Sequence, residues 1–199
     1  MIENSRALAQ TVAMKQFKLW FTLVLAAGVL AGCGSSTNSA GSGGATNSNA
    51  VTTTAPATIT NADGTVIDAT NRHLLHAQPK LPTLKVWLGD QELITELATQ
   101  SVQIATGMMF RTNLLENEAM LFVFPDAAPR NFYMRNCVVP LTAAYISPDG
   151  VIQEFARLVP GDEIGVQSRA MNIQFVLELP QGWHERHNIQ PGAVVRTER

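Results

Sequence analysis

The sequence predicts a mainly β protein, a compact antiparallel β-sandwich or barrel-like domain of about eight short strands with one or two short helices. Apolar or alternating runs recur at intervals of about ten residues, and prolines or the turn Pro148-Asp149-Gly150 separate several of them. Short strands at such regular spacing are typical of sandwiches and barrels. The expected strands are residues 84–88, 93–98, 119–124, 131–136, 141–147, 151–158, 172–179 and 193–197.

Two short helices and a small hairpin complete the expected elements. Residues 99–109 carry apolar side chains at helical spacing and offer Thr99 or Ser101 as an N-cap, which predicts a short helix there. A second helical turn is expected within 181–188. Nearer the N-terminus, 58–60 and 65–67 flank Asn61-Ala62-Asp63-Gly64, a pattern that favours a small hairpin.

The first 32 residues have the layout of an export signal. A basic start with Lys15 and Lys18 is followed by an uncharged stretch from 19 to 32 and then by a cysteine. This stretch of 14 residues is too short to span a bilayer as a helix, which takes roughly 20. Because Glu3 introduces an acid where export signals normally have none, Met14 is expected to be the true start.

The end of this segment, Leu30-Ala31-Gly32-Cys33, resembles the lipobox of bacterial lipoprotein signal peptides. The resemblance implies cleavage before Cys33 and lipid on its sulfur, so that the membrane is a partner through this lipid. An ordinary secretory signal is the alternative, but its A-x-A-like site matches less well. The residue after Cys33 is Gly34 and not Asp. In lipoproteins of two-membraned bacteria, a residue other than Asp at this position goes with the outer membrane. The expected location is therefore the cell envelope, on the periplasmic face of the outer membrane if the source has two membranes.

The remaining chain divides into a tether and a domain. Residues 33–79 begin with a stretch rich in Ser, Thr, Asn and Gly, a composition that cannot offset the entropy of ordering, and they are expected to form a flexible tether. Residues 80–199 are expected to form the globular domain.

Composition excludes some classes of function. From Cys33 onward the chain has 167 residues, 11 of them Lys or Arg and 15 Asp or Glu, and it contains no basic run. Nucleic acid is therefore not an expected partner, since binding to phosphates depends on clustered cations. With Cys33 lipidated, Cys137 is the remaining thiol, so no internal disulfide is expected.

Four segments spaced along the chain carry a resemblance to a known family: 107–111, 120–124, 132–137 and 139–141. In order, they resemble the family catalogued as domain of unknown function 192. The resemblance implies a compact β-sandwich with a short helix, often exported or lipid-anchored, and no particular activity. The family pattern usually reads Trp-Met-Lys-Asn-Thr followed by Leu-Asp, whereas this chain has Tyr133, Arg135, Cys137 and Thr142 at the differing places.

Arg111, Arg135 and Asn136 are the candidate ligand-binding residues, because they interrupt the most apolar part of the chain. Two guanidiniums and an amide suit a carboxylate or phosphate, which predicts a small anionic ligand. In the alternative interpretation, which we favour, these three side chains hold no ligand and only bond to neighbouring groups of the fold, as buried polar groups usually do. Asn136 would then bond a turn backbone, and each Arg would pair with one of Glu116, Glu118, Asp126 and Asp149.

Metal and thiol chemistry are weaker alternatives, and neither a metal nor a cofactor is expected. Methionine thioethers with Cys137 would suit Cu(I), but methionine is also a common core residue; the methionines are Met108, Met109, Met120, Met134 and Met171. Zinc needs three or four ligands, whereas the histidines occur as two pairs, His73 with His76 and His184 with His187. Burial is expected to make Cys137 an inert packed thiol rather than a nucleophile.

These observations favour a membrane-anchored envelope lipoprotein whose single β-domain is a non-enzymatic binding or structural module. Its expected partners are a small anionic ligand or another envelope protein. The alternative is a hydrolase-like enzyme that acts on a small anionic substrate at Arg111, Arg135 and Asn136.

Overall fold

The computed structural model describes residues 57–198 and confirms a mainly β protein with two short helices in that range. The signal segment, Cys33 and residues 33–56 of the expected tether lie outside the described residues. The elements are β1 Thr58–Thr60, β2 Val66–Asp68, β3 Thr83–Leu88, β4 Gln91–Ala98, α2 Ser101–Thr106, β5 Glu118–Ala128, β6 Asn131–Phe132, β7 Leu141–Ile146, β8 Ile152–Leu158, β9 Val166–Gln167, β10 Ile173–Pro180, α3 Trp183–Arg186 and β11 Val195–Thr197.

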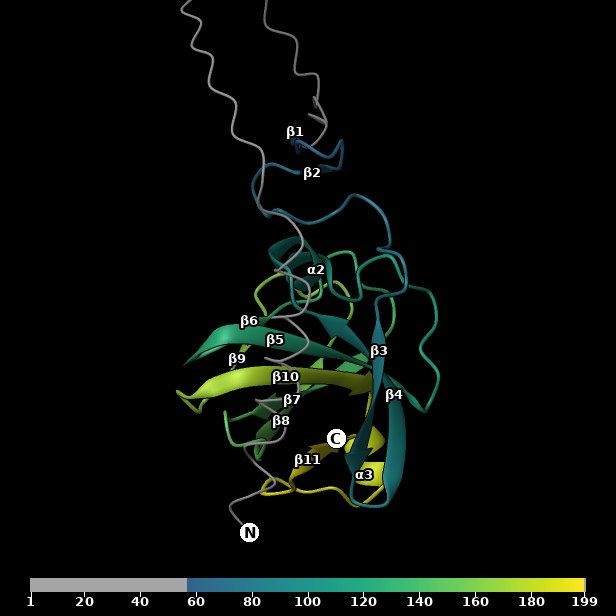
Figure 1. The fold of residues 1–199 in the computed structure, drawn as a ribbon, viewed down its shortest axis with the longest axis vertical. Coiled ribbons are helices and arrows are strands. Elements are labelled where there is room, and N and C mark those ends of the chain that lie inside the picture. Colours follow the sequence, from purple (N-terminus) through teal and green to yellow (C-terminus); the bar gives the residue numbers. More distant parts are fainter. Residues whose placement is uncertain (1–56, 199) are drawn as a thin grey trace, which may run out of the picture.

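Seven strands form one curled sheet in the order β11-β3-β4-β5-β10-β7-β8 (Figure 1). Within residues 57–198 its neighbouring strands run antiparallel, except that β4 and β5 are parallel. A parallel pair needs a crossover connection, and here α2 and the loop after it supply one. The expected antiparallel arrangement is confirmed at the other pairings of this sheet, and the parallel contact of β4 with β5 adds to it.

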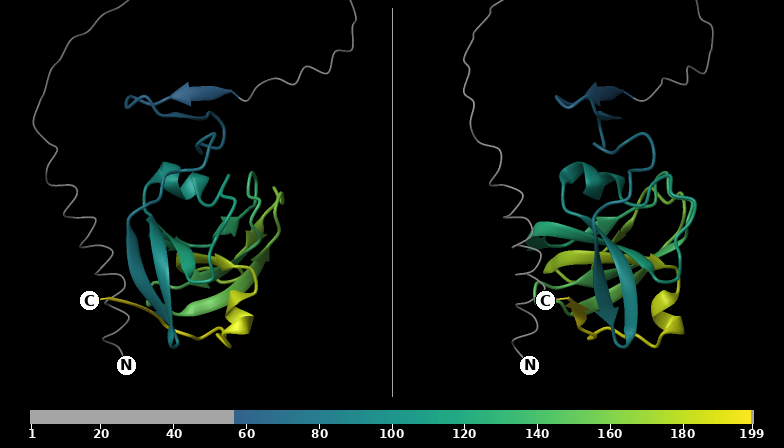
Figure 2. Two further views of the ribbon diagram at one scale, coloured as in Figure 1. Left: turned by 90° about the vertical axis from the view of Figure 1, so that its right-hand side faces the viewer. Right: turned by 45° about the vertical axis from the view of Figure 1, so that its right-hand side comes forward.

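The two edges of the curled sheet meet at one end. Val151, just before β8, bridges Val194, just before β11. The Ile152 amide donates to the Ala193 carbonyl at 2.9 Å, and the Val195 amide donates to the Gly150 carbonyl at 2.9 Å. The result is a half-barrel (Figure 2). These hydrogen bonds between its two edges satisfy some of the backbone groups there, which protects the edges from pairing with other chains.

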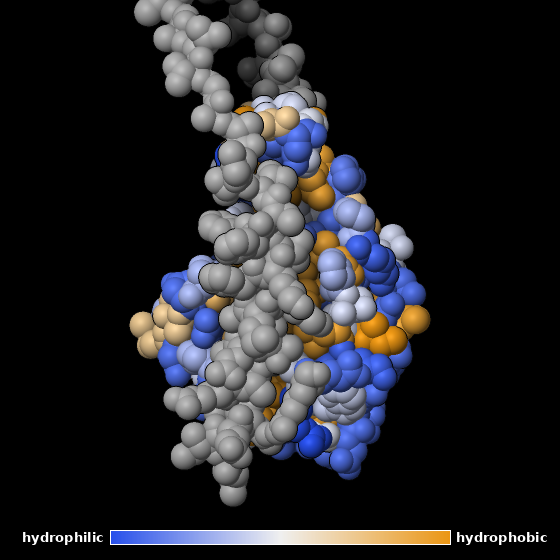
Figure 3. Space-filling model, viewed as in Figure 1, coloured by the Kyte–Doolittle hydropathy of each residue, from blue (hydrophilic) through white to orange (hydrophobic). Residues whose placement is uncertain are grey.

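Both faces of the sheet are buried. Inside the curl, alternate residues of β5, β7 and β10 pack with α3 and the β3–β4 hairpin around Leu121, Leu177 and Trp183. The opposite face carries Met120, Phe122 and Tyr145 and is covered by α2 and by the loops that follow α2, β5 and β8. In Figure 1, α2 lies above β5 and β10, and α3 lies below them. On the outer surface drawn in Figure 3, hydrophobic residues are interspersed with hydrophilic ones.

Two expected elements differ in detail. Helix α2 is capped by Gln100 instead of Thr99 or Ser101, because the Gln103 Oε1 accepts the Thr99 and Gln100 amides, each at 3.0 Å. The strand expected over 131–136 is only β6, which pairs with β9. Beyond β6, Asn136 has a φ of +56°, a left-handed conformation that ends extended structure.

The sequence predicts a tether up to residue 79, but part of this stretch is ordered. The hairpin of β1 and β2 is present, with Ile59 paired to Ile67. The Leu74 amide then donates to the Thr106 hydroxyl of α2 at 3.0 Å, and the Gln78 side chain donates to the Gly107 carbonyl at 2.8 Å. The folded unit therefore begins before Lys80, because these groups satisfy the C-terminal end of α2.

Of the helices described between residues 57 and 198, none combines the length and apolar composition that crossing a membrane requires.

Candidate functional site

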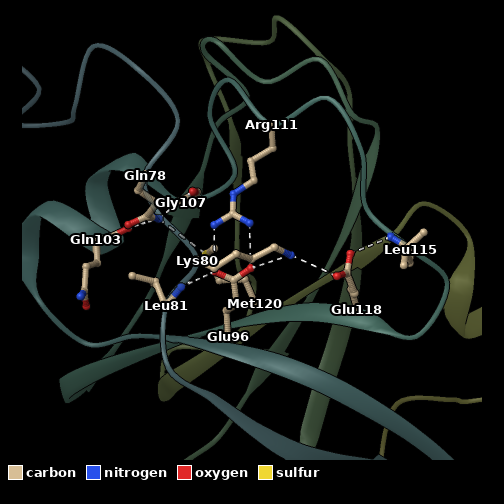
Figure 4. A network of polar contacts seen from close by, with 10 residues as sticks. All are labelled: Gln78, Lys80, Leu81, Glu96, Gln103, Gly107, Arg111, Leu115, Glu118 and Met120. Carbon is tan, nitrogen blue, oxygen red and sulfur yellow. Dashed lines mark hydrogen bonds and ion pairs between the residues drawn. The ribbon is translucent and has the colours of Figure 1, made fainter.

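Arg111 is committed to a buried ion pair with Glu96 of β4 (Figure 4). Its two terminal nitrogens bind the two carboxylate oxygens at 2.7 and 2.8 Å. The same carboxylate accepts the Leu81 amide at 2.8 Å and lies 3.3 Å from the Lys80 ammonium. Burial alone raises the pKa of Glu96, but the hydrogen bonds from Arg111 and Leu81 outweigh it and hold the pKa below its usual value.

Arg135 and Asn136 have other partners. Arg135 pairs with Glu163 at 2.8 Å on the surface. The Asn136 carbonyl accepts the Phe110 amide at 2.8 Å, which fixes the turn that its left-handed backbone makes. Neither residue, nor Arg111, lines either of the two cavities found in residues 57–198.

The geometry thus favours the structural interpretation of these three residues over an anion site. The prediction of which acids pair with the two arginines is wrong, since Arg111 pairs with Glu96 and Arg135 pairs with Glu163. The expected acids have other contacts: Glu116 with Arg186 and His187, Glu118 with Lys80, Asp126 with Arg130, and Asp149 with Ser147.

The four histidines do not come together in one site. His73 bonds the Leu74 carbonyl, and His76 bonds the Ala77 carbonyl. His184 stacks on Phe155, while His187 contacts Glu116. Within the described range, no three His, Cys, Asp or Glu side chains are grouped so as to hold a metal ion.

An apolar hollow with a volume of about 400 Å³ lies where α2 and the loops cover β5 and β10. We call it the Glu178 pocket. Its wall is formed by the end of α2 and the turn after it, by β5, by the loop around β6, and by β10. The apolar lining includes Ile104, Met108, Met109, Phe122, Phe124 and Phe132. The polar lining residues are Thr106, Arg130, Asn131, Tyr133, Cys137 and Glu178.

Strand geometry places Glu178 on this side of the sheet. Along β10, Phe175, Leu177 and Leu179 enter the core inside the curl, so Val176 and Glu178 point to the opposite face. Glu178 is paired with Met120 of β5 and Ala143 of β7. The short side chain of Ala143 leaves space beside it. A carboxyl therefore lies in the middle of the sheet, against the covering layer.

The Glu178 carboxyl is buried without compensation. It is 4% exposed, and its Oε2 atom has no hydrogen-bond partner within residues 57–198. Burial raises the pKa of Glu178 to about 8, so the group is mostly protonated at neutral pH. An unpaired buried polar group destabilises the fold, and such groups concentrate at functional sites.

Cys137 lines the same pocket as an inert thiol. Burial raises its pKa to about 12, and the neighbouring Glu178 adds to the rise. A thiolate is the nucleophilic form, and this environment disfavours it. The expected burial of Cys137 is confirmed.

Arg130 lies at the edge of the pocket over the ring of Phe124, with its guanidinium carbon 4.0 Å from the ring centre. It donates to the Ile173 carbonyl at 3.1 Å and pairs with Asp126 at 2.9 Å. Next to it, the rings of Phe122 and Phe132 meet edge to face at 4.9 Å. Aromatic rings thus form much of the wall.

A second, more polar cavity of about 530 Å³ lies at α3 and β8. Thr142, at the place where the family pattern has Asp, is part of its lining and accepts the Gly182 amide at 3.0 Å. The Thr142 hydroxyl therefore satisfies a backbone amide just before α3. His184 also lines this cavity, and burial lowers its pKa.

Sequence analysis missed Glu178 and Arg130. The available signal for Glu178 was an acid inside the apolar run 173–179, where both faces of a central strand are buried. Arg130 had no comparable signal, because its ring partner and its carbonyl partner come from β5 and β10.

The fold and this site define a class: a curled β-sheet with an apolar, small-molecule-sized pocket under its covering layer. The chain belongs to the DUF192 family, described as an uncharacterized ACR, whose profile matches residues 85–197.

Two solved structures are similar. One is a protein from Sinorhizobium meliloti 1021 described as a candidate transcription regulator, with 28% identity and a TM-score of 0.57, covering 61% of this chain and 98% of that one. The other is a protein of unknown function from Novosphingobium aromaticivorans DSM 12444, with 28% identity and a TM-score of 0.52, covering 71% of this chain and 94% of that one. A search of curated proteins gave no match.

Proposed function

We propose that this protein is a lipid-anchored envelope protein whose β-domain binds a small, mainly apolar molecule in the Glu178 pocket. The observation that carries the proposal is the pocket itself, a hollow of about 400 Å³ with an apolar wall and a buried carboxyl whose Oε2 atom has no partner in the part of the chain that the structure describes. Ligand sites have this size and this mixture of apolar walls with a few polar groups.

Binding accounts for the site better than catalysis does. A thiol enzyme needs an activated cysteine, whereas the raised pKa of Cys137 keeps its sulfur protonated. A hydrolase acting through Arg111 loses support because Glu96 already occupies both ends of that guanidinium. The role described for the Sinorhizobium protein gains no support either, since acids outnumber basic residues 16 to 14 in this chain.

The anchor rests on the lipobox-like sequence that ends at Cys33. Lipid at Cys33 would hold the protein at a membrane, and Gly34 favours the outer membrane of a two-membraned source. Wild-type protein should incorporate labelled palmitate and sediment with membranes, whereas Cys33→Ser should do neither. Wild-type protein without label would contradict the anchor and leave the pocket untouched.

The pocket is tested with 1-aminoanthracene, a flat apolar probe whose fluorescence rises in dry surroundings. The protein used is the full chain carrying Cys33→Ser. The probe should become fluorescent with this protein, and Ala105→Trp should abolish the effect, because Ala105 lines the pocket and a larger side chain would fill it.

Ser101→Trp is the matched control, because Ser101 lies exposed at the start of the same helix and outside the pocket lining. It should leave the fluorescence unchanged. Equal loss in both variants, or no enhancement in the parent, would contradict binding at this place.

A further inference from the structure

We propose that the Glu178 pocket selects ligands that carry a protonated amine, which pairs with Glu178 while an apolar body lies against the aromatic wall. This inference rests on the proposed binding function and gives it a substrate class. The juxtaposition that carries it is a buried, unpartnered carboxyl under a wall of aromatic rings.

In its ionised form Glu178 needs a donor, and within residues 57–198 its buried Oε2 atom has none. Its sheet neighbours are Met120 and Ala143, and neither side chain has a hydrogen to donate. Cys137, on the covering loop, offers at most a weak S–H donor. A ligand ammonium brings three strong donors, and a charge-assisted bond is roughly twice as strong as a neutral one.

The aromatic wall suits the same ligand charge. Phe122, Phe132 and Tyr133 line the pocket, and ring faces attract cations. Arg130 already demonstrates the interaction on Phe124, at 4.0 Å from the ring centre. An anionic ligand gains less here, because Arg130, the cationic side chain in the pocket lining, is already paired with Asp126.

The groups that face Glu178 leave it as the one that titrates near neutral pH. Cys137 from the covering loop and Tyr145 from β7 both have pKa values raised by burial, so both are neutral. Burial also raises the pKa of Tyr133, and the guanidinium of Arg130 is paired with Asp126. Pairing with an amine requires the ionised form of Glu178, so binding must release the proton that this group carries at pH 7.

The test uses 4-phenylbutylamine with two isosteres, the neutral 4-phenylbutan-1-ol and the anionic 4-phenylbutanoate. Calorimetry on the full chain carrying Cys33→Ser, in buffers of different ionisation enthalpy, measures affinity and proton release together. With a free pKa of about 8, amine binding at pH 7 should release close to one proton. Affinity should fall about fifty-fold from pH 8 to pH 6, as the ionised fraction falls.

Glu178→Gln should weaken the amine at least tenfold and remove the proton release, while the alcohol binds as before and thereby reports an intact pocket. Glu92→Gln, an exposed acid on β4 paired with Lys85, is the matched control and should change nothing. The proton release of the parent is an independent readout if Glu178→Gln does not fold.

The outcomes separate this inference from the proposed function. If the alcohol or the acid binds as tightly as the amine, or if the amine binds without releasing a proton, the amine preference is overturned and the pocket stands. The same holds if 1-aminoanthracene binds and all three probes fail. If 1-aminoanthracene and all three probes fail, the binding function itself is overturned.

Discussion

Glu96 and Glu178 lie in one row across the same sheet, but their surroundings shift their pKa values in opposite directions. Glu96 is paired across the sheet with Met120, which is paired in turn with Glu178. The two carboxyls are thus two strands apart, roughly 10 Å by ordinary strand spacing, and they are 5% and 4% exposed. Arg111, Leu81 and Lys80 surround the first, whereas the second has an unpartnered oxygen.

The difference shows that burial alone does not decide the state of a carboxyl. The pKa of Glu96 lies below its usual value because its partners outweigh its burial, and the pKa of Glu178 is raised to about 8 because nothing opposes burial. One acid stabilises the fold in its charged form. The other is tolerated only while neutral, or once a ligand supplies what the protein does not.

The largest expected effect comes from breaking the Glu96 pair. Arg111→Gln removes the bidentate partner and leaves a buried carboxylate, which should cost about 3–5 kcal/mol in the free energy of unfolding. Denaturant titration at pH 7 measures the loss. Unchanged or increased stability would contradict the structural role and revive an anion site at Arg111.

The second prediction concerns pH, where the two acids act in opposite directions. The folded pKa of Glu178 is raised, so its contribution to stability is complete below its unfolded pKa and is lost as pH rises toward about 8. The folded pKa of Glu96 is lowered, so its contribution is present at neutral pH and is lost as pH falls through that value.

Glu178→Gln isolates one of these slopes, because glutamine resembles the protonated acid at every pH. The variant should match the parent near pH 4 and exceed it increasingly up to pH 8, by about 1.4 kcal/mol per pH unit between the unfolded and folded pKa values. Unfolding titrations at pH 5, 6, 7 and 8 give the difference. A constant difference would mean that Glu178 is paired in solution.

The third prediction concerns the residues before β3, which cover the Glu96 side of the row. A chain that begins at Lys80 lacks Leu74 and Gln78, which bond Thr106 and Gly107 (Figure 4 shows Gln78). Losing one buried leucine and two hydrogen bonds should lower stability by about 2–3 kcal/mol relative to a chain that begins at 57. Equal denaturation midpoints would restore the expectation that the tether reaches residue 79.

The smallest effect is expected at Arg135. Its pair with Glu163 is on the surface, with side-chain exposures of 31% and 59%. Arg135→Gln should therefore change the free energy of unfolding by less than about 1 kcal/mol, and high salt should reduce the difference further. A loss of stability comparable to that of Arg111→Gln would contradict the expectation that an exposed ion pair contributes less to stability than a buried one.

Local patterns predicted the elements well, because alternation and turn residues act over a few positions. The β3–β4 hairpin and β10 were readable in this way. Pairings between distant segments were not readable. The parallel contact of β4 with β5 and the approach of Arg111 to Glu96 both depend on the path of the chain through α2 and the loop after it.

The pocket escaped prediction for a related reason. Glu178 is a single acid in an apolar run, and only the strand order shows that Met120 and Ala143 flank it. The candidates that the sequence did suggest, Arg111, Arg135 and Asn136, were chosen for polarity within apolar surroundings. The same criterion applied to β10 would have included Glu178.

The pairing of β3 with β11 has a consequence for how the chain acquires its structure. The first strand of the main sheet, β3, pairs with β4 on one side and on the other with β11, the last strand, Val86 lying opposite Thr197 and Leu88 opposite Val195. Contacts between such distant positions give a high contact order and slow folding. During synthesis, the sheet has to wait for its final residues before this edge forms.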